Sequence, residues 1–355
     1  MSTLVTILIA IVLFGILILV HELGHFFAGR MVGIQPKEFS IGMGPVILSR
    51  ERKGIKYNLK ALPIGGSCLF LGEDEEHKAS GAFNNAPVWR RMVTIAAGPV
   101  MNFLLGVVLI MVLYMALGIM QIQPVVDKFN DSDVFSGGNP AQEAGLLPGD
   151  RIVGVDGAYW GDLPDETIIQ NVHAALSQGE GAPVALTVVR EGEGELTRTV
   201  TPIYNAQDNA YQIGIVFKNE VVKVGFFRSI AYGFRDAVGA IVTMVTFLGQ
   251  LIFRGQGAGD VLGPVGIMTE IGNAVRMGWE YVINLAIIIS LNLGLINLVP
   301  FPALDGGRLT LLVVEGIRRK PFNREREGFF HLIGFALLML LMVLITYRDI
   351  VKLFQ

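Results

Sequence analysis

The sequence predicts a polytopic α-helical membrane protein with four transmembrane helices, a cytoplasmic membrane-associated β-hairpin and one α+β domain inserted outside the cytoplasm. Hydrophobic residues make up 52% of the 355 residues and charged residues only 17%, whereas about 25% of an average soluble protein is charged. The apolar residues form a few long uncharged runs, and the loops between these runs differ in the sign of their net charge. A formal net charge of −3 gives no indication of a nucleic-acid partner.

Four uncharged runs are long enough to cross about 30 Å of hydrocarbon at a rise of about 1.5 Å per residue. They cover residues 1–20, 92–126, 281–304 and 328–347, and the last is interrupted only by His331. The first run has no basic start and is not followed by the small-residue cleavage site of a signal peptide. We therefore expect it to remain as the first of four transmembrane helices.

The charge of the loops predicts the orientation of these helices. Residues 30–91 contain ten Lys and Arg against six Asp and Glu, and residues 305–327 contain six against four. Residues 127–228 instead contain fifteen Asp and Glu against seven Lys and Arg. Because short cytoplasmic loops are enriched in Lys and Arg, we expect the first two segments in the cytoplasm and the acidic segment outside it.

A fifth apolar run, residues 237–253, has 17 uncharged residues and lies at the lower limit for a span. If it crossed the membrane, the basic loop at residues 305–327 would lie outside the cytoplasm, against the charge rule. Arg228, Arg235 and Arg254 flank the run, as is typical of a helix that lies in the membrane interface or packs against the helix bundle. We therefore expect residues 221–278 to form an interfacial helical segment that does not span.

The first span ends in the sequence His21-Glu22-Leu23-Gly24-His25. Two histidines four residues apart lie on one face of a helix and can bind the same metal ion. HExxH is the motif of zinc hydrolases, in which the glutamate removes a proton from an activated water. Such polar residues are unfavourable at the end of an apolar helix unless a metal or polar partners compensate for them. The alternative is a polar interfacial cap without a metal.

A catalytic zinc ion needs three protein ligands and a water, so the two histidines require a third partner. Asp305 is the candidate, because it ends the third predicted span and lies on the same predicted side of the membrane as the histidines. Pro300 and Pro302 break the helix before it. Irregular backbone at membrane depth is tolerated where it lines a water-filled cavity. Asp305 would otherwise only mark the end of a helix.

Three motifs together resemble the site-2 protease family of intramembrane zinc metalloproteases. They are HExxH, the NxxPxPxLDG stretch at residues 297–306, and Gly263-Pro264-Val265-Gly266 before the third span. The resemblance implies a bound zinc ion, with the ligands His21, His25 and Asp305, and Glu22 as the general base. It also implies that Asn297 holds the substrate backbone or the developing oxyanion, although a buried amide there could instead hydrogen bond within the core.

Two further segments fit this resemblance. Residues 54–71 read as strands around turns, which is typical of a β-hairpin. In the family such a hairpin presents an edge to extended substrates, and an ordinary surface hairpin is the alternative. The acidic segment resembles a PDZ domain, most clearly at residues 139–157, and has room for one such domain where some family members carry two. A PDZ domain either captures peptides by strand addition or excludes bulky ectodomains by size.

The chain is therefore expected to comprise four parts. Residues 1–123 carry HExxH and the hairpin, residues 124–220 form the PDZ domain, residues 221–278 form the interfacial segment, and residues 279–355 carry the LDG motif. We expect a multi-pass protein of a bacterial inner membrane, with its active site facing the cytoplasm and its PDZ domain outside.

The resemblance also implies partners. The expected substrates are single-pass membrane proteins, such as trimmed anti-sigma factors or signal-peptide remnants, cleaved in regulated intramembrane proteolysis. The lipid bilayer and a peptide ligand of the PDZ domain are the other expected partners. The alternative function is that of a PDZ-bearing membrane scaffold or chaperone without a proteolytic role, which the intact His21, Glu22, His25 and Asp305 argue against.

Overall fold

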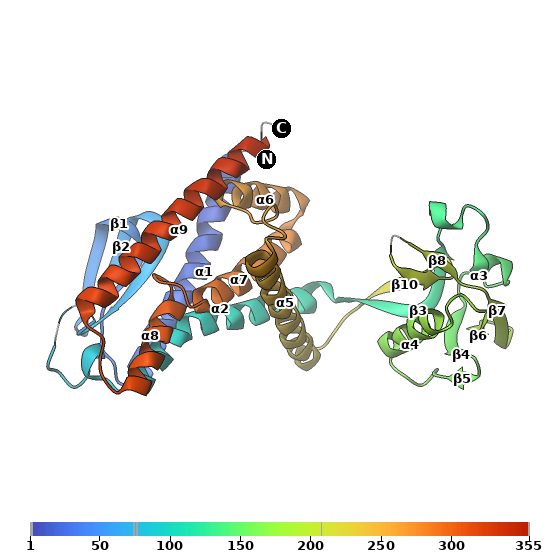
Figure 1. Cartoon of the computed structure of the whole chain (residues 1–355), viewed down its shortest axis with the longest axis horizontal. Helices are drawn as coiled ribbons and strands as arrows, with labels where there is room; N and C mark the ends of the chain where they lie inside the picture. The colour runs from blue at the N-terminus through green and yellow to red at the C-terminus, as the bar shows by residue number, and fades with distance from the viewer. Residues whose placement is uncertain (1–2, 74, 76, 207, 354–355) are drawn as a thin grey trace. The chain divides into compact units, whose positions relative to one another are not determined.

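The computed structural model describes residues 3–73, 75, 77–206 and 208–353 and divides into two compact units. Unit 1 comprises Met1–Ala116 and Gly225–Gln355, and unit 2 comprises Leu117–Val224. Unit 1 consists mainly of helices and unit 2 mainly of strands (Figure 1).

Unit 1 contains the long apolar helices. Its helices are α1 (Thr3–Met31), α2 (Val88–Leu117), α5 (Phe226–Arg254), α6 (Pro264–Met277), α7 (Trp279–Leu298), α8 (Asp305–Arg318) and α9 (Arg324–Leu353), with a short 3-10 turn η1 (Phe83–Asn85). Among the described residues, five of these helices are long and apolar enough to cross a membrane by length and composition: α1, α2, α5, α7 and α9. The chain is thus a multi-pass membrane protein, and the prediction of four spans is not confirmed.

The additional candidate is α5, which the sequence suggested was barely long enough. The helix continues past both ends of the uncharged run and reaches 29 residues. Tertiary contacts support its charged first half, because the Tyr114 hydroxyl of α2 donates a hydrogen bond of 2.6 Å to Asp236. Gly233 allows α5 to approach the α2 backbone, since a Cβ there would lie 3.2 Å from the Val107 carbonyl oxygen.

Two predicted spans end earlier in the structure than their apolar runs do. Of the run at residues 92–126, only the part up to Leu117 is helical, and Gly118 (φ 85°) turns the chain into strand β3 (Ile119–Phe129). In the run at residues 281–304, α7 ends at Leu298, two residues before Pro300. Hydrophobicity alone did not separate a strand or an irregular turn from the helix before it.

The loop between α1 and α2 forms two long paired strands, β1 (Pro36–Arg52) and β2 (Ile55–Phe70), that pack against α1 (Figure 1). Lys53 and Gly54 connect them with φ angles of 53° and 76°, the left-handed conformation of a tight hairpin turn. Residues 36–41 of β1 pair with residues 66–70 on one side and with residues 56–59 on the other. The strands begin earlier than the sequence suggested, because Gly42, Gly44 and Pro45 obscure the pattern of β1.

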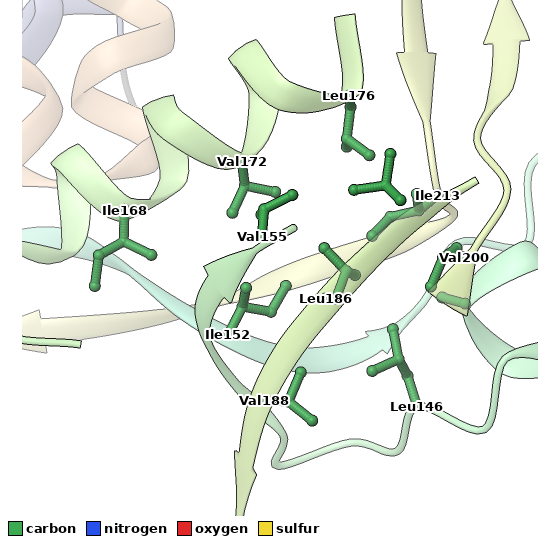
Figure 2. Packing of buried hydrophobic residues seen from close by; sticks show 12 residues of the cluster. Leu146, Ile152, Val155, Ile168, Val172, Leu176, Leu186, Val188, Val200 and Ile213 are labelled. Atoms are coloured by element: carbon green, nitrogen blue, oxygen red, sulfur yellow. The ribbon is translucent and has the colours of Figure 1, made fainter. Parts of the chain in front are cut away.

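Unit 2 is built on a sheet in the order β10-β3-β4-β6-β7 with β5 paired to β4, and a separate pair β8-β9. Its further strands are β4 (Arg151–Val155), β5 (Ala158–Tyr159), β6 (Val184–Arg190), β7 (Gly194–Val200), β8 (Ile203–Asn205), β9 (Ala210–Gln212) and β10 (Ile215–Val222), with the helices η2 (Asp133–Phe135), α3 (Pro140–Glu143) and α4 (Asp165–Gln178). Ile168, Val172 and Leu176 lie on one face of α4 and pack against Ile152 and Leu186 of the sheet (Figure 2). β3 pairs with β10, so the chain enters and leaves unit 2 through neighbouring strands.

Candidate metal centre

α1 presents both histidines of HExxH on one buried face. His21 and His25 are 8% and 7% exposed, and their Nε2 atoms lie 3.2 Å apart. The two rings meet edge to face with their centroids 4.8 Å apart. The neighbouring helix α2 can approach this face because Gly98 has no side chain, and a Cβ at that position would clash with the His25 imidazole.

Asp305 is the first residue of α8, and its side chain extends toward the two histidines. Its Oδ2 atom lies 3.1 Å from Nε2 of His21 and 3.3 Å from Nε2 of His25. The turn between α7 and α8 is tight: a Cβ on Gly306 would clash with the Val299 carbonyl, and one on Gly307 with the Phe301 carbonyl. The two glycines after Asp305 therefore allow this backbone to fold closely enough to aim its carboxylate.

These three residues have the donor set and the convergence of a metal site. The ligand atoms of His21, His25 and Asp305 all lie within 4.8 Å of one another. Two imidazole nitrogens and one carboxylate oxygen are ligands that zinc accepts in catalytic sites. Asp305 Oδ2 is buried and makes no other hydrogen bond among the described residues. The structure thus brings together the three residues that the sequence predicted as ligands.

The second nitrogen of each imidazole is held by α2. His25 Nδ1 lies 2.9 Å from the backbone carbonyl of Thr94, to which it donates. His21 Nδ1 lies 3.1 Å from Nδ2 of the Asn102 side chain, which is fully buried. Rotating this amide by about 180° places its oxygen, which otherwise has no hydrogen-bond partner among the described residues, against Nδ1–H, and both Nε2 atoms then keep their lone pairs for a metal.

Sequence reasoning missed this role of α2. The signal available in the sequence was Asn102 itself, a polar residue in the middle of an uncharged run. Its partner His21 is 81 residues away, so no spacing motif connects the two.

Glu22 lies against strand β2. A Cβ on Gly66 would be 2.9 Å from Glu22 Cγ and 3.3 Å from the Ser40 carbonyl oxygen, so Gly66 leaves the space that the glutamate occupies. The Cys68 backbone amide lies within hydrogen-bonding reach of the Glu22 carboxylate. The sheet therefore restrains the glutamate that the sequence predicted as the general base.

A cavity of about 670 Å³ surrounds this cluster. Its walls include Glu22, residues 65–70 of β2, Asn297 in the last turn of α7, and Arg308 of α8. The structure thus places Asn297 in the same cavity as the three candidate ligands. Arg308 pairs with Glu73, and this ion pair joins α8 to the segment after β2 in the cavity wall.

Electrostatics keeps Asp305 ionised. Burial alone would raise the pKa of its carboxyl group, but hydrogen bonds and charge from His21 and His25 in their protonated forms outweigh burial and hold the pKa well below its usual range. An anionic carboxylate is the form that binds a metal cation.

Comparison with known proteins identifies the family. The sequence pattern of "Peptidase family M50" matches residues 9–341. The chain belongs to peptidase family M50. A protein of Clostridium acetobutylicum whose name places it among the zinc metalloproteases is 37% identical over 349 residues, 97% of each chain. Zinc metalloprotease RasP of Bacillus licheniformis is 32% identical, with 98% of this chain and 99% of the relative covered. Regulator of sigma-W protease RasP of Bacillus subtilis is 30% identical, with the same coverage.

M50 is the family of the site-2 proteases, so the family predicted from the three sequence motifs is confirmed. The predicted class of enzyme, a zinc metalloendopeptidase, and the predicted zinc cofactor are confirmed as well.

Replacing Asp305 by alanine should abolish stoichiometric zinc binding, because two histidines alone leave a catalytic zinc site one protein ligand short. Zinc content per chain, measured by mass spectrometry on purified protein, tests this. Asp349→Ala is the matched control, because Asp349 is also buried in unit 1 but binds the amides of Gly263 and Gly266. Full zinc content in Asp305→Ala would rule out Asp305 as a ligand.

Replacing Asn102 by alanine should weaken zinc affinity by about 10- to 100-fold, the usual effect of removing the partner of a ligating histidine. Competition with a chelator measures this affinity. Ser290→Ala serves as the control, because Ser290 bonds the Asn102 backbone carbonyl at 2.8 Å and does not touch the histidine. An equal loss in both variants would indicate that helix packing, and not the amide, is responsible.

Proposed function

We propose that this peptidase cleaves peptide bonds within or next to the transmembrane helix of single-pass membrane proteins. The observation that carries the proposal is the position of the candidate centre: His21 and His25 lie on a long apolar helix and meet Asp305 inside a cavity shared with Glu22 and a β-strand. A site at the end of an apolar helix, with room for water, suits hydrolysis of a substrate that arrives through the membrane.

In this proposal His21, His25 and Asp305 hold the zinc ion. When bound, zinc supplies Lewis acidity for activating water and polarising the scissile carbonyl. Glu22 accepts the proton of the attacking water and returns it to the leaving amine. Asn297 lies in the wall of the same cavity and would donate its amide hydrogen bond to the substrate as negative charge develops on the carbonyl oxygen.

Strand β2 would hold the substrate in an extended form. Residues 65–70 line the cavity and belong to the sheet that restrains Glu22. Backbone pairing of a peptide with an available strand gives affinity without demanding particular side chains. A peptide aligned with this strand would lie next to the general base.

We propose a topology of four spans, formed by α1, α2, α7 and α9, with α5 in the interface. The contact between His21 and Asp305 implies that α1 and α7 end on the same side, and Thr94 near the start of α2 lies on that side too. α5 then starts outside, and α7 must also start outside. α6 has 14 residues, or about 21 Å of helix, too short to cross. A crossing by α5 would therefore leave α7 starting on the wrong side.

Unit 2 would then lie outside the cytoplasm, as its acid excess also favours. We propose that it is a PDZ-type domain that excludes substrates still carrying bulky ectodomains. A relative is named for regulating sigma-W, which supports trimmed anti-sigma factors as a substrate class for this chain, beside signal-peptide remnants.

Replacing Glu22 by glutamine should lower cleavage of a purified single-pass reporter by about 10²- to 10⁴-fold, the contribution of general acid–base catalysis, while zinc content stays unchanged. Glu38→Gln is the matched control, since Glu38 lines the same cavity but bonds Ser40 and Lys60. Equal cleavage by wild type and Glu22→Gln would exclude Glu22 as the base. Absence of cleavage by zinc-loaded wild type would favour the scaffold function.

The topology can be tested with single cysteines in a Cys68→Ser background. Cysteines at Ser80 and Asn323 should be protected from an impermeant thiol reagent in intact cells, because the loops that carry them are proposed to be cytoplasmic. A cysteine at Glu191 in unit 2 should be labelled. All three side chains are exposed in the structure. Labelling of Asn323 without labelling of Ser80 would mean that α5 spans.

A further inference from the structure

A second polar cavity, of about 560 Å³, lies in unit 1 where α1 ends and the β1–β2 turn folds back. Its walls come from the last turn of α1, the segment leading into β1, and the turn between the strands. They are Arg30, Gly33, Ile34, Gln35, Pro36, Arg52, Lys53, Gly54, Ile55 and Tyr57. None of these residues lines the cavity of the metal centre.

This cavity is positively charged. Arg30, Arg52 and Lys53 contribute to its wall, and the wall residues include no Asp or Glu. Arg90 adds a fourth cation, because a Cβ on Gly33 would lie 3.7 Å from Arg90 Nη1. Within the part of the chain that the structure describes, none of the four forms an ion pair. Four cations gathered without acidic partners repel one another unless an anion binds among them.

Local structure fixes the cations in this arrangement. Arg52 pairs with Ile55 across the turn, and Ile55 is 8% exposed within a cluster containing Phe26 and Phe39. Lys53 is held in its left-handed conformation by the same two-residue turn. The Arg30 guanidinium lies 5.5 Å from the centre of the Phe26 ring, a cation–π distance. The cavity is thus supported by the packing of α1 against the sheet.

The surroundings are those of a membrane interface. Arg30 lies in the last turn of an apolar helix whose neighbouring Phe27 and Met31 are 52% and 86% exposed. Trp89, next to Arg90 at the start of α2, is 57% exposed. Apolar and aromatic side chains beside cations are typical of the depth at which lipid headgroups lie.

We propose that this cavity binds the phosphate of an anionic glycerophospholipid headgroup. Free phosphate would offer the same charge, but the exposed apolar residues beside the cavity can accommodate the acyl chains that only a lipid carries. Basic pockets at the cytoplasmic side of membrane helices are suited to such headgroups.

The bound lipid would stabilise the β1–β2 sheet at its turn. The same sheet lines the cavity of the metal centre with residues 65–70 and lies against Glu22 at Gly66. Bound anionic lipid would therefore favour the position of the sheet in which a peptide paired with β2 lies next to Glu22. This effect on cleavage rests on the proposed function, whereas lipid binding itself does not.

Binding can be measured on the full chain in neutral detergent by native mass spectrometry with added phosphatidylglycerol or phosphatidylcholine. Wild type should bind phosphatidylglycerol more tightly than phosphatidylcholine. Arg52→Gln/Lys53→Asn should bind phosphatidylglycerol at least about tenfold more weakly than wild type does, because each cation near a headgroup contributes appreciably to binding. Asparagine tolerates the left-handed conformation of residue 53. Arg50→Gln/Lys56→Gln is the matched control: it removes the same charge close to the same turn, at residues that do not line the cavity.

Equal weakening in both double variants, or no preference for phosphatidylglycerol in wild type, would overturn the proposal. Displacement of the lipid by millimolar inorganic phosphate would assign the cavity to a free anion and would also overturn it. Unchanged zinc content would show that the variants are folded. In vesicles, adding phosphatidylglycerol to phosphatidylcholine should raise reporter cleavage by wild type and the control several-fold more than by Arg52→Gln/Lys53→Asn. Absence of cleavage in every protein would contradict the proposed function and leave the binding result standing.

Discussion

Two imidazoles and a carboxylate buried beside apolar helices are unfavourable unless each polar atom has a partner, and much of unit 1 follows from that requirement. The Nε2 atoms of His21 and His25 face Asp305, while their Nδ1 atoms bond to Asn102 and Thr94 of α2. Three separate parts of the chain must therefore meet at one point. A metal ion bound where the two Nε2 atoms and the Asp305 carboxylate meet would offset the repulsion between their lone pairs.

Close approach of backbone makes this meeting possible. Gly98 brings α2 against the His25 ring, and Gly306 and Gly307 fold the start of α8 under the end of α7. Gly66 does the same for the sheet, which contacts Glu22. A side chain at any of these positions would separate two elements that meet at the centre. The helices supply the ligands and the glycines set the distance between them.

The β1–β2 sheet lines both the cavity of the metal centre and the basic cavity at the end of α1. One end lines the catalytic cavity and restrains Glu22, while the turn at Lys53 and Gly54 borders a basic cavity near the end of α1. Residues 36–41 of β1 pair with residues 56–59 beside the turn and also with residues 66–70, so a ligand that fixes the turn also limits the motion of residues 65–70. A lipid bound at the turn would therefore influence the position of Glu22 without touching the metal site.

The sequence by itself determined the parts of the site that depend on local geometry. The period of the helix places His21 and His25 on one face in any fold, and Pro300 and Pro302 break α7 before Asp305. Those residues, with the motif at residues 297–306, also identified the family. Hydropathy located the helices but misplaced their ends at Leu117 and Leu298, because it does not distinguish a buried strand or an irregular turn from a helix.

Only the tertiary structure decided which distant groups meet. Asn102 and the Thr94 carbonyl are 81 and 69 residues from the histidines that they orient, and no periodicity links residues so far apart. The contacts of α5 with Tyr114 and the α2 backbone likewise join residues far apart in the sequence. Arg30, Arg52 and Arg90 become one basic cavity only once α1, the sheet and α2 pack together. Spacing along one helix follows from its fixed period, whereas contact between elements depends on packing that a sequence read one segment at a time does not contain.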